Sequence, residues 1–239
     1  MIGTIFNAAA IVIGGIAGLT MKQPLSGSTQ AAFKIFLGAC VTFFGLRLTW
    51  LSISEGSAGQ AFKQLLVVVL AMILGKLCGR LLRLQKLSNR LGQFAKTRME
   101  HAQTSPTKRP SDGFNACTVL FCAAPLGIVG ATTDGLSAYS TPLIAKAVMD
   151  ALAAVAFVPL FGWGVMLSAI PVLAFQGSIT LIAREIARTI DPQLVLSINA
   201  TAGLLIFTVA LVIFQLKRID LADYLPSLVF APVITWLLR

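Results

Sequence analysis

Charged and metal-binding residues are scarce in this sequence. Only 12% of its 239 residues are charged, and His101 is the single histidine. A soluble domain carries roughly 25% charged residues, so this composition argues against a soluble protein. The sequence also lacks the HExxH motif of metalloproteases and the GxSxG motif of serine hydrolases. We therefore expect neither a cofactor nor an enzymatic activity.

Cysteine is rare as well. The four cysteines all lie inside apolar stretches, at Cys40, Cys78, Cys117 and Cys122. Cys117 and Cys122 are five residues apart, so they do not share a helix face, and no further cysteine or histidine completes a metal-site spacing. We expect these thiols to pack as small buried hydrophobic side chains, and we expect no metal centre.

Long hydrophobic stretches make up most of the chain. Hydrophobic residues account for 56% of the sequence, and the mean hydropathy is +0.85. At about 20 residues for each membrane crossing, the length accommodates seven or eight helices. We expect one integral membrane domain over residues 1–239, an all-α polytopic bundle. The expected spans are 2–20, 32–53, 63–83, 113–132, 141–159, 164–184 and 194–215.

The last apolar stretch, residues 224–238, allows two interpretations. It has 15 residues and contains Pro226 and Pro232. This is short for a straight crossing. The sequence therefore leaves open whether the stretch spans the membrane or is re-entrant.

Most of the formal charge of +10 lies in one place. From Lys76 to Arg109 there are nine lysines and arginines and one acidic residue, Glu100. The positive-inside rule places this connector, residues 84–112, in the cytoplasm and the N-terminus outside, and Lys22 agrees. We expect it to contact anionic lipids and not nucleic acid. Its polar, proline-containing second half predicts a flexible segment.

Two prolines predict helices that are broken or kinked inside the membrane. Pro125 lies in the middle of 113–132, and Pro171 lies in 164–184, five residues before Gln176. A proline removes a backbone donor and frees carbonyl groups, which in lipid must find partners in protein or in a water-filled cavity. Broken helices at mid-membrane are how many transporters build their binding sites.

A few polar residues stand out inside the apolar stretches. Lys146 and Asp150 are four residues apart on one helix face, with Asp150 close to mid-span. They form either an internal structural ion pair or a functional pair, and an ionisable group at membrane depth is a functional hypothesis by default. The candidate residues for binding a substrate or an ion are Asp150, Lys146, Gln176, Asp134, Asn115 and Asn7. Two of them have a simpler interpretation than ligand binding. Asn7 could form an interhelical hydrogen bond, and Asp134 could be a solvated turn residue.

Small residues recur at helical spacing. Gly14-x-x-x-Gly18 and Gly75-x-x-x-Gly79 allow helices to approach closely, either within the chain or between copies in a homo-oligomer. The first three and last three spans also share a weak pattern that would fit an inverted repeat. The tripeptides Phe6-Asn7-Ala8 and Phe114-Asn115-Ala116 offer a competing alignment.

Four segments together resemble a known family. They are MIGTIFNAAAIVIGGIAGL, LFCAAPLGIVGATTDGL, LIAKAVMDALAAVA and SAIPVLAFQGSITL. In this combination they resemble the YdfK/YqgA-type bacterial inner-membrane proteins, the domain of unknown function 554. The resemblance implies an integral plasma-membrane protein of bacteria, for which transport is often assumed without an established substrate. The family pattern falls on Asp134-Gly135, Lys146, Asp150 and Gln176-Gly177, whereas Ala147 stands where the family often has serine.

Three function classes can be separated by the surroundings of Asp150. A small-solute or ion transporter predicts that Asp150, Lys146, Gln176 and the break at Pro125 line one polar cavity. A structural or regulatory membrane protein, which uses its basic connector to bind lipid or a partner, predicts a closed and dry ion pair. The third class, an intramembrane enzyme, has no catalytic motif to support it.

Overall fold

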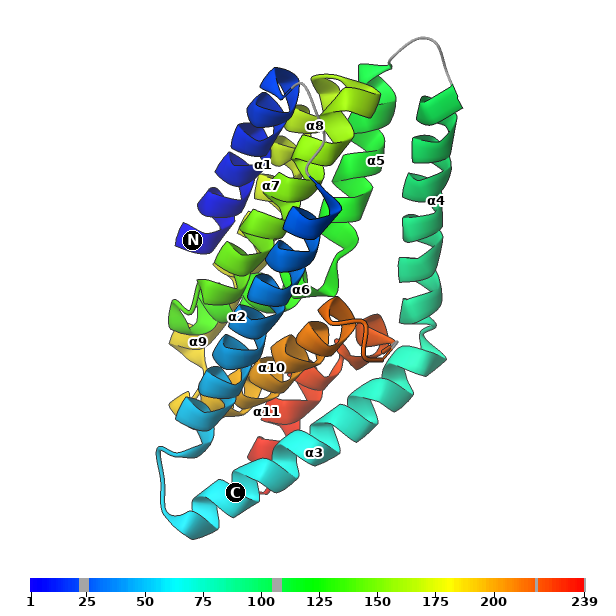
Figure 1. The fold of residues 1–239 in the computed structure, drawn as a ribbon. Coiled ribbons are helices and arrows are strands. Elements are labelled where there is room, and N and C mark those ends of the chain that lie inside the picture. Colours follow the sequence, from blue (N-terminus) through cyan, green and yellow to red (C-terminus); the bar gives the residue numbers. More distant parts are fainter. Residues whose placement is uncertain (22–25, 105–108, 218, 239) are drawn as a thin grey trace.

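The protein is a bundle of helices, shown as a ribbon in Figure 1. The structure is a computed structural model and describes residues 1–21, 26–104, 109–217 and 219–238. All regular structure in these ranges is helical. Six of the helices are long and apolar enough to cross a membrane, and a seventh span results if one bent helix pair is counted as one. The expected all-α polytopic fold is confirmed. Lys22 and residues 105–108 of the basic connector lie outside the described ranges.

The helix bounds follow the expected spans closely. In the first half of the chain they are α1 (Ile2–Thr20), α2 (Gly27–Ile53), α3 (Ala58–Leu81), α4 (Leu84–Thr104), α5 (Pro110–Ala123) and α6 (Pro125–Ser137). In the second half they are α7 (Thr141–Phe161), α8 (Gly164–Leu167), α9 (Ala169–Thr189), α10 (Pro192–Ile213), the 3₁₀ helix η1 (Leu221–Tyr224) and α11 (Ser227–Leu237).

The outer surface of the bundle is apolar. Large hydrophobic side chains such as Ile13, Phe36 and Ile170 are each more than 60% exposed. A soluble monomer rarely exposes so much contiguous apolar surface. These side chains are therefore the lipid-facing surface of a multi-pass membrane protein.

The basic connector is more helical than expected, because its second half, which was predicted to be flexible, is helical up to Thr104. Most of it is the helix α4, which runs alongside α5 in Figure 1 and buries Ala95. Near its end, Arg98 Nη1 lies 2.8 Å from Asp112 Oδ1 at the start of α5. The prediction was wrong because it rested on the polar composition of this segment and did not consider the apolar stripe through which α4 packs on α5.

The start of α4 is held by η1, which is far away in the sequence. The backbone N–H of Gln85 donates to Asp223 Oδ1 at 2.8 Å, and the N–H of Ala222 donates to Gln85 Oε1 at 3.1 Å. Asp223 thus satisfies a free N–H of the first helix turn, as a capping residue does, but from another element. Asp223 is itself buried against Gly79 of α3.

The expected break at Pro125 is present. Pro125 is the first residue of α6, and the axes of α5 and α6 differ by 59°. A proline fits this position because the first helix turn needs no intrahelical N–H. The second expected interruption lies at Ser168, between α8 and α9, so that Pro171 falls in the first turn of α9.

The final apolar stretch forms η1 and the 11-residue α11. At 1.5 Å per residue, α11 is about 16 Å long, roughly half the thickness of a bilayer core. It packs on α3 and α10. It is too short to cross the membrane alone.

Glycines let the helices of three helix pairs approach each other closely. In the pair of α1 and α7, a Cβ at Gly14 would lie 2.3 Å from the Ala151 carbonyl oxygen. In the pair of α3 and α11, Gly75 faces the backbone of Ser227. In the pair of α2 and α10, Gly45 and Gly203 pack against each other's carbonyl oxygens. The small-residue motifs Gly14/Gly18 and Gly75/Gly79 therefore serve packing within the chain.

Substituting Gly203 by alanine should weaken the α2–α10 contact. The new Cβ would lie 2.3 Å from Thr49 Oγ1 and 2.6 Å from the Gly45 carbonyl oxygen. Such overpacking costs about 1–3 kcal/mol, so the melting temperature of the purified protein should fall by several degrees. Gly92→Ala is the control, because a Cβ there meets nothing within 4 Å. Equal melting temperatures for the two variants would contradict the close packing.

Removing the Asp223 carboxylate should loosen the start of α4. In Asp223→Ala, the Gln85 N–H loses its acceptor, at a cost of about 0.5–2 kcal/mol for a lost cap. Hydrogen–deuterium exchange should then rise in residues 84–90 and stay unchanged near Asp112. Asp220→Ala is the matched control, because Asp220 is exposed at the start of the same segment. Unaltered exchange in the Asp223 variant would show that η1 does not anchor α4.

Candidate functional site

The most polar part of the protein interior is on α7. Lys146 Nζ forms an ion pair with Asp150 Oδ2 one helix turn away. The two side chains are only 2% and 10% exposed. Removing two charges from water costs several kcal/mol per ion, and the pairing offsets this cost only in part. Such a pair is an expensive feature in the middle of a membrane helix.

Two amide side chains from neighbouring helices reach this pair. Asn7 of α1 donates from Nδ2 to Oε1 of Gln176 of α9, at 3.1 Å. Both residues are fully buried. The Asn7 side chain also interacts with the Asp150 carboxylate. Thus α1, α7 and α9 each contribute a polar group to one place.

The broken helix completes the arrangement. Gly127 lies in the first turn of α6, and a Cβ there would be 3.0 Å from Lys146 Cε and 3.1 Å from Gln176 Nε2. The absence of a side chain lets both groups lie against the helix start, where N–H groups are free and the helix dipole is positive. We call Asn7, Gly127, Lys146, Asp150 and Gln176 the central cluster. Phe121 of α5 borders it, with its ring centre 5.9 Å from Lys146 Nζ.

Two atoms of the central cluster have no hydrogen-bond partner among the residues that the structure describes. They are Asn7 Oδ1 and Gln176 Nε2, an acceptor and a donor. One turn away on the same two helices, Thr4 and Thr180 share a 3.1 Å hydrogen bond, and Thr180 also donates to the Ala131 carbonyl at 3.2 Å. A buried unpaired polar atom costs about 1–3 kcal/mol, so two together beside an ion pair need an explanation.

The structure brings four of the six candidate residues together: Asp150, Lys146, Gln176 and Asn7. Asp134 lies near the other end of α6, with Oδ2 3.0 Å from the amino group of Met1. Asn115 is exposed on α5. Sequence analysis missed Gly127 and Phe121. Gly127 could have been found as the glycine that follows the break at Pro125, whereas nothing in the sequence marks Phe121.

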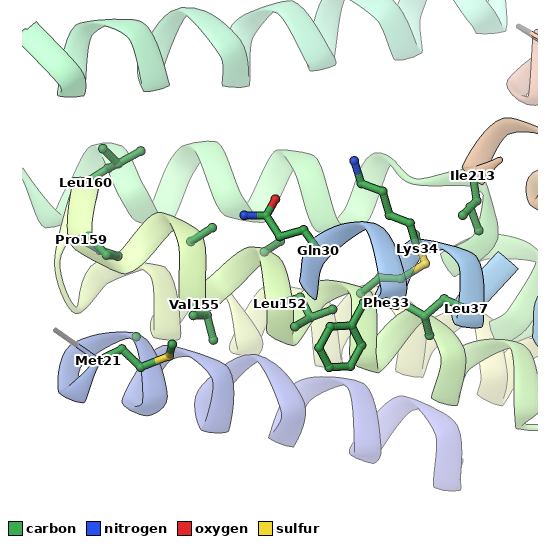
Figure 2. A pocket seen from close by; sticks show the side chains of 14 residues that line it. Met21, Gln30, Phe33, Lys34, Leu37, Leu152, Val155, Pro159, Leu160 and Ile213 are labelled. Atoms are coloured by element: carbon green, nitrogen blue, oxygen red, sulfur yellow. The ribbon is translucent and has the colours of Figure 1, made fainter. Parts of the chain in front are cut away.

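The central cluster is closed. Three cavities in the described part of the chain, of about 570, 330 and 310 Å³, are lined by other residues. The largest lies between α1, α2 and α7 and is mostly apolar. Figure 2 shows Gln30 and Lys34 extending to one side of α2 and Phe33 pointing to the other. The proximity of Asp150, Lys146, Gln176 and the helix break agrees with the transporter hypothesis. The closed ion pair agrees with the structural hypothesis.

No metal centre is found in the ranges that the structure describes. No group of three or more His, Cys, Asp or Glu side chains there could hold an ion. All four cysteines are free thiols, and Cys117 is buried.

Removing one member of the ion pair should destabilise the protein more than removing both. Lys146→Met leaves an unpaired buried carboxylate and Asp150→Leu an unpaired ammonium, at about 3–5 kcal/mol each. The double variant carries neither charge, so its melting temperature should lie above those of both single variants. Thermal unfolding of the four proteins in detergent measures this. Additive losses in the double variant would show that the two charges are not coupled.

Comparison with known proteins places the chain in a family. Residues 2–236 match the family described as "Protein of unknown function (DUF554)". The chain is 26% identical over 240 residues to the uncharacterized membrane protein YdfK of Bacillus subtilis (strain 168). The alignment covers 100% of this chain and 97% of YdfK. It is 28% identical over 232 residues to the uncharacterized protein YqgA of Escherichia coli (strain K12), covering 97% and 94% of the two chains. No solved structure matches it. Because the match spans nearly the whole chain, this protein belongs to the DUF554 family, as its sequence motifs had implied.

Proposed function

We propose that this protein is a small secondary transporter for a small solute or an ion, and that the central cluster binds the cargo. The observation that carries the proposal is the unpaired donor and acceptor, Gln176 Nε2 and Asn7 Oδ1, beside a buried ion pair. A purely structural ion pair needs no such atoms. A binding site does, because its cargo supplies the missing partners.

The position of the central cluster supports the same proposal. The cluster lies where α6 starts, at the 59° break between α5 and α6. Half-helix ends at mid-membrane provide ion and substrate sites in many transporters. In this proposal the closed cluster is the occluded arrangement. Movement of α6 against α7 and α9 would open it to one side of the membrane at a time.

The orientation of the protein in the membrane is part of the proposal. The positive-inside rule supports a cytoplasmic position for α4, because of the basic residues around it, and an N-terminus outside. Cargo would then pass between the start of α1 and the end of α5 that carries Asp112.

A second candidate function rests on the surface of α4 and the end of α3. Exposed basic side chains lie along this surface, and Leu81 at the end of α3 is 84% exposed. The basic residues are Arg80, Arg83, Lys86, Arg90 and Lys96. Basic and apolar groups in one place fit a membrane surface with anionic lipids. A structural or regulatory protein would use this surface and keep the Lys146–Asp150 pair closed. The unpaired amide atoms favour the transporter.

A ligand that fills the central cluster should raise the melting temperature of the purified protein. A ligand that binds only the folded state, at 100 times its Kd, stabilises it by about 2.7 kcal/mol. We would screen inorganic ions, carboxylates, amines and amino acids against wild type and Gln176→Ala. The shift seen in wild type should be absent or much smaller in Gln176→Ala.

Asn199→Ala is the control for that screen. Asn199 is also buried with an unpaired amide oxygen, but it lies on α10, which contributes no side chain to the central cluster. This variant should keep the full ligand-induced shift. A screen in which no compound stabilises wild type, or in which Gln176→Ala responds as wild type does, would contradict transport through this site and favour the second candidate function.

A further inference from the structure

We infer that the cargo is a small monocarboxylate, the size of formate or acetate, which binds together with one proton carried by Asp150. This inference rests on the transport proposed above and names its substrate class. It is drawn from the charges of the central cluster, from the two unpaired amide atoms and from the close approach of Lys146 and Gln176 to Gly127.

The net charge of the central cluster limits what can enter it. The central cluster holds one cation, Lys146, and one anion, Asp150, both buried. An added ion that left a net charge there would carry a large desolvation penalty. If Asp150 takes up a proton from water as a carboxylate anion binds to Lys146, the site stays neutral in both states. The carboxyl oxygen of Asp150 gains the proton, and the Lys146–Asp150 ion pair is replaced by a Lys146–cargo ion pair.

The unpaired atoms match this exchange one by one. Protonated Asp150 gains an O–H donor, and the free acceptor Asn7 Oδ1 belongs to a side chain that already interacts with it. The cargo carboxylate brings two acceptor oxygens. One can accept from Lys146 Nζ and the other from the free donor Gln176 Nε2. The start of α6 adds the positive end of a helix dipole.

The two neighbouring donor side chains favour a small carboxylate over other anions. Lys146 Cε and Gln176 Nε2 approach Gly127 from different helices, at 3.0 and 3.1 Å from the position of a missing Cβ. The amide donor of Gln176 therefore lies near the end of the Lys146 side chain that carries the Nζ donors. Two oxygens on one carbon bridge two such donors, whereas a halide offers a single centre. Inorganic phosphate brings further oxygens and charge that the closed cluster does not match.

Among the described residues, no other charged group competes for this role around Asp150. Lys146 is its partner on α7, and Cys117 and Cys122 of α5 are titratable groups that interact with Asp150. Asn7 from α1, Gly127 from α6 and Gln176 from α9 are uncharged. From α2, Lys34 lines the 570 Å³ cavity, and from α4, Arg98 is paired with Asp112. Within the described residues, the Lys146–Asp150 pair alone can couple a proton to an anion here.

Calorimetric titration of the purified protein with sodium acetate tests the inference. Titrations in buffers of different ionisation enthalpy give the number of protons taken up per acetate bound. We expect one proton, and an apparent Kd that rises about tenfold per pH unit where Asp150 is ionised in the empty protein. Asp150→Asn mimics the protonated state. It should bind acetate with no proton uptake and with a Kd that does not change with pH.

Further variants separate a specific site from a general effect of salt. Lys146→Met should abolish acetate binding. Gln176→Ala should weaken it at least about tenfold, because it removes one hydrogen bond to a charged group. Asn199→Ala should leave acetate binding unchanged. Where a variant unfolds in the calorimeter, its melting temperature with and without acetate replaces the titration. Sodium chloride and glycine are titrated in parallel.

The outcomes distinguish this inference from the proposal beneath it. Proton-linked acetate binding that needs Lys146 and Gln176 would support both. Binding of glycine, chloride or a metal cation in place of acetate, or acetate binding without proton uptake, would overturn the inference and leave a transport site. No stabilisation by any compound of the wider screen would overturn both.

Discussion

The buried ion pair between Lys146 and Asp150 is the interaction on which the centre of this protein depends. Both charges are hidden from water and lie one helix turn apart on α7. Charges at this depth persist only with partners, and here the partners come from α1, α6 and α9 as well. A membrane protein that needed only to hold its helices together could use apolar packing instead. The pair is therefore the basis of the binding site proposed above.

Close glycine contacts make this centre possible. Gly14 and Gly18 let α1 lie against the backbone of α7. This close contact brings Asn7 of α1 to Asp150 of α7. Gly127 lets the start of α6 approach Lys146 and Gln176. In lipid, helices gain little from hydrophobic burial against each other, so such packing is a main source of association. The same contacts that stabilise the bundle thus determine which polar groups meet.

Much of this arrangement could be predicted from the sequence, because its main signals are local. Long apolar stretches gave the helices, Pro125 gave the break, and the spacing of Lys146 and Asp150 gave their pairing. The partnership of Asn7 with Gln176 could not be derived, since 169 positions separate the two residues and only tertiary packing joins them. The helix α4 was missed because its polar composition was given more weight than its apolar stripe. Its fixed position depends on Asp223 and Asp112, which contact it from other elements.

The central claim is that the central cluster binds a ligand, and an experimental structure would test it most directly. The protein would be determined in the presence of acetate at acidic pH, at a resolution that shows water molecules. We expect density for a small non-protein molecule between Lys146 Nζ and Gln176 Nε2, with Asp150 turned towards Asn7 Oδ1. A closed Lys146–Asp150 pair with nothing bound beside the two amides would contradict the claim.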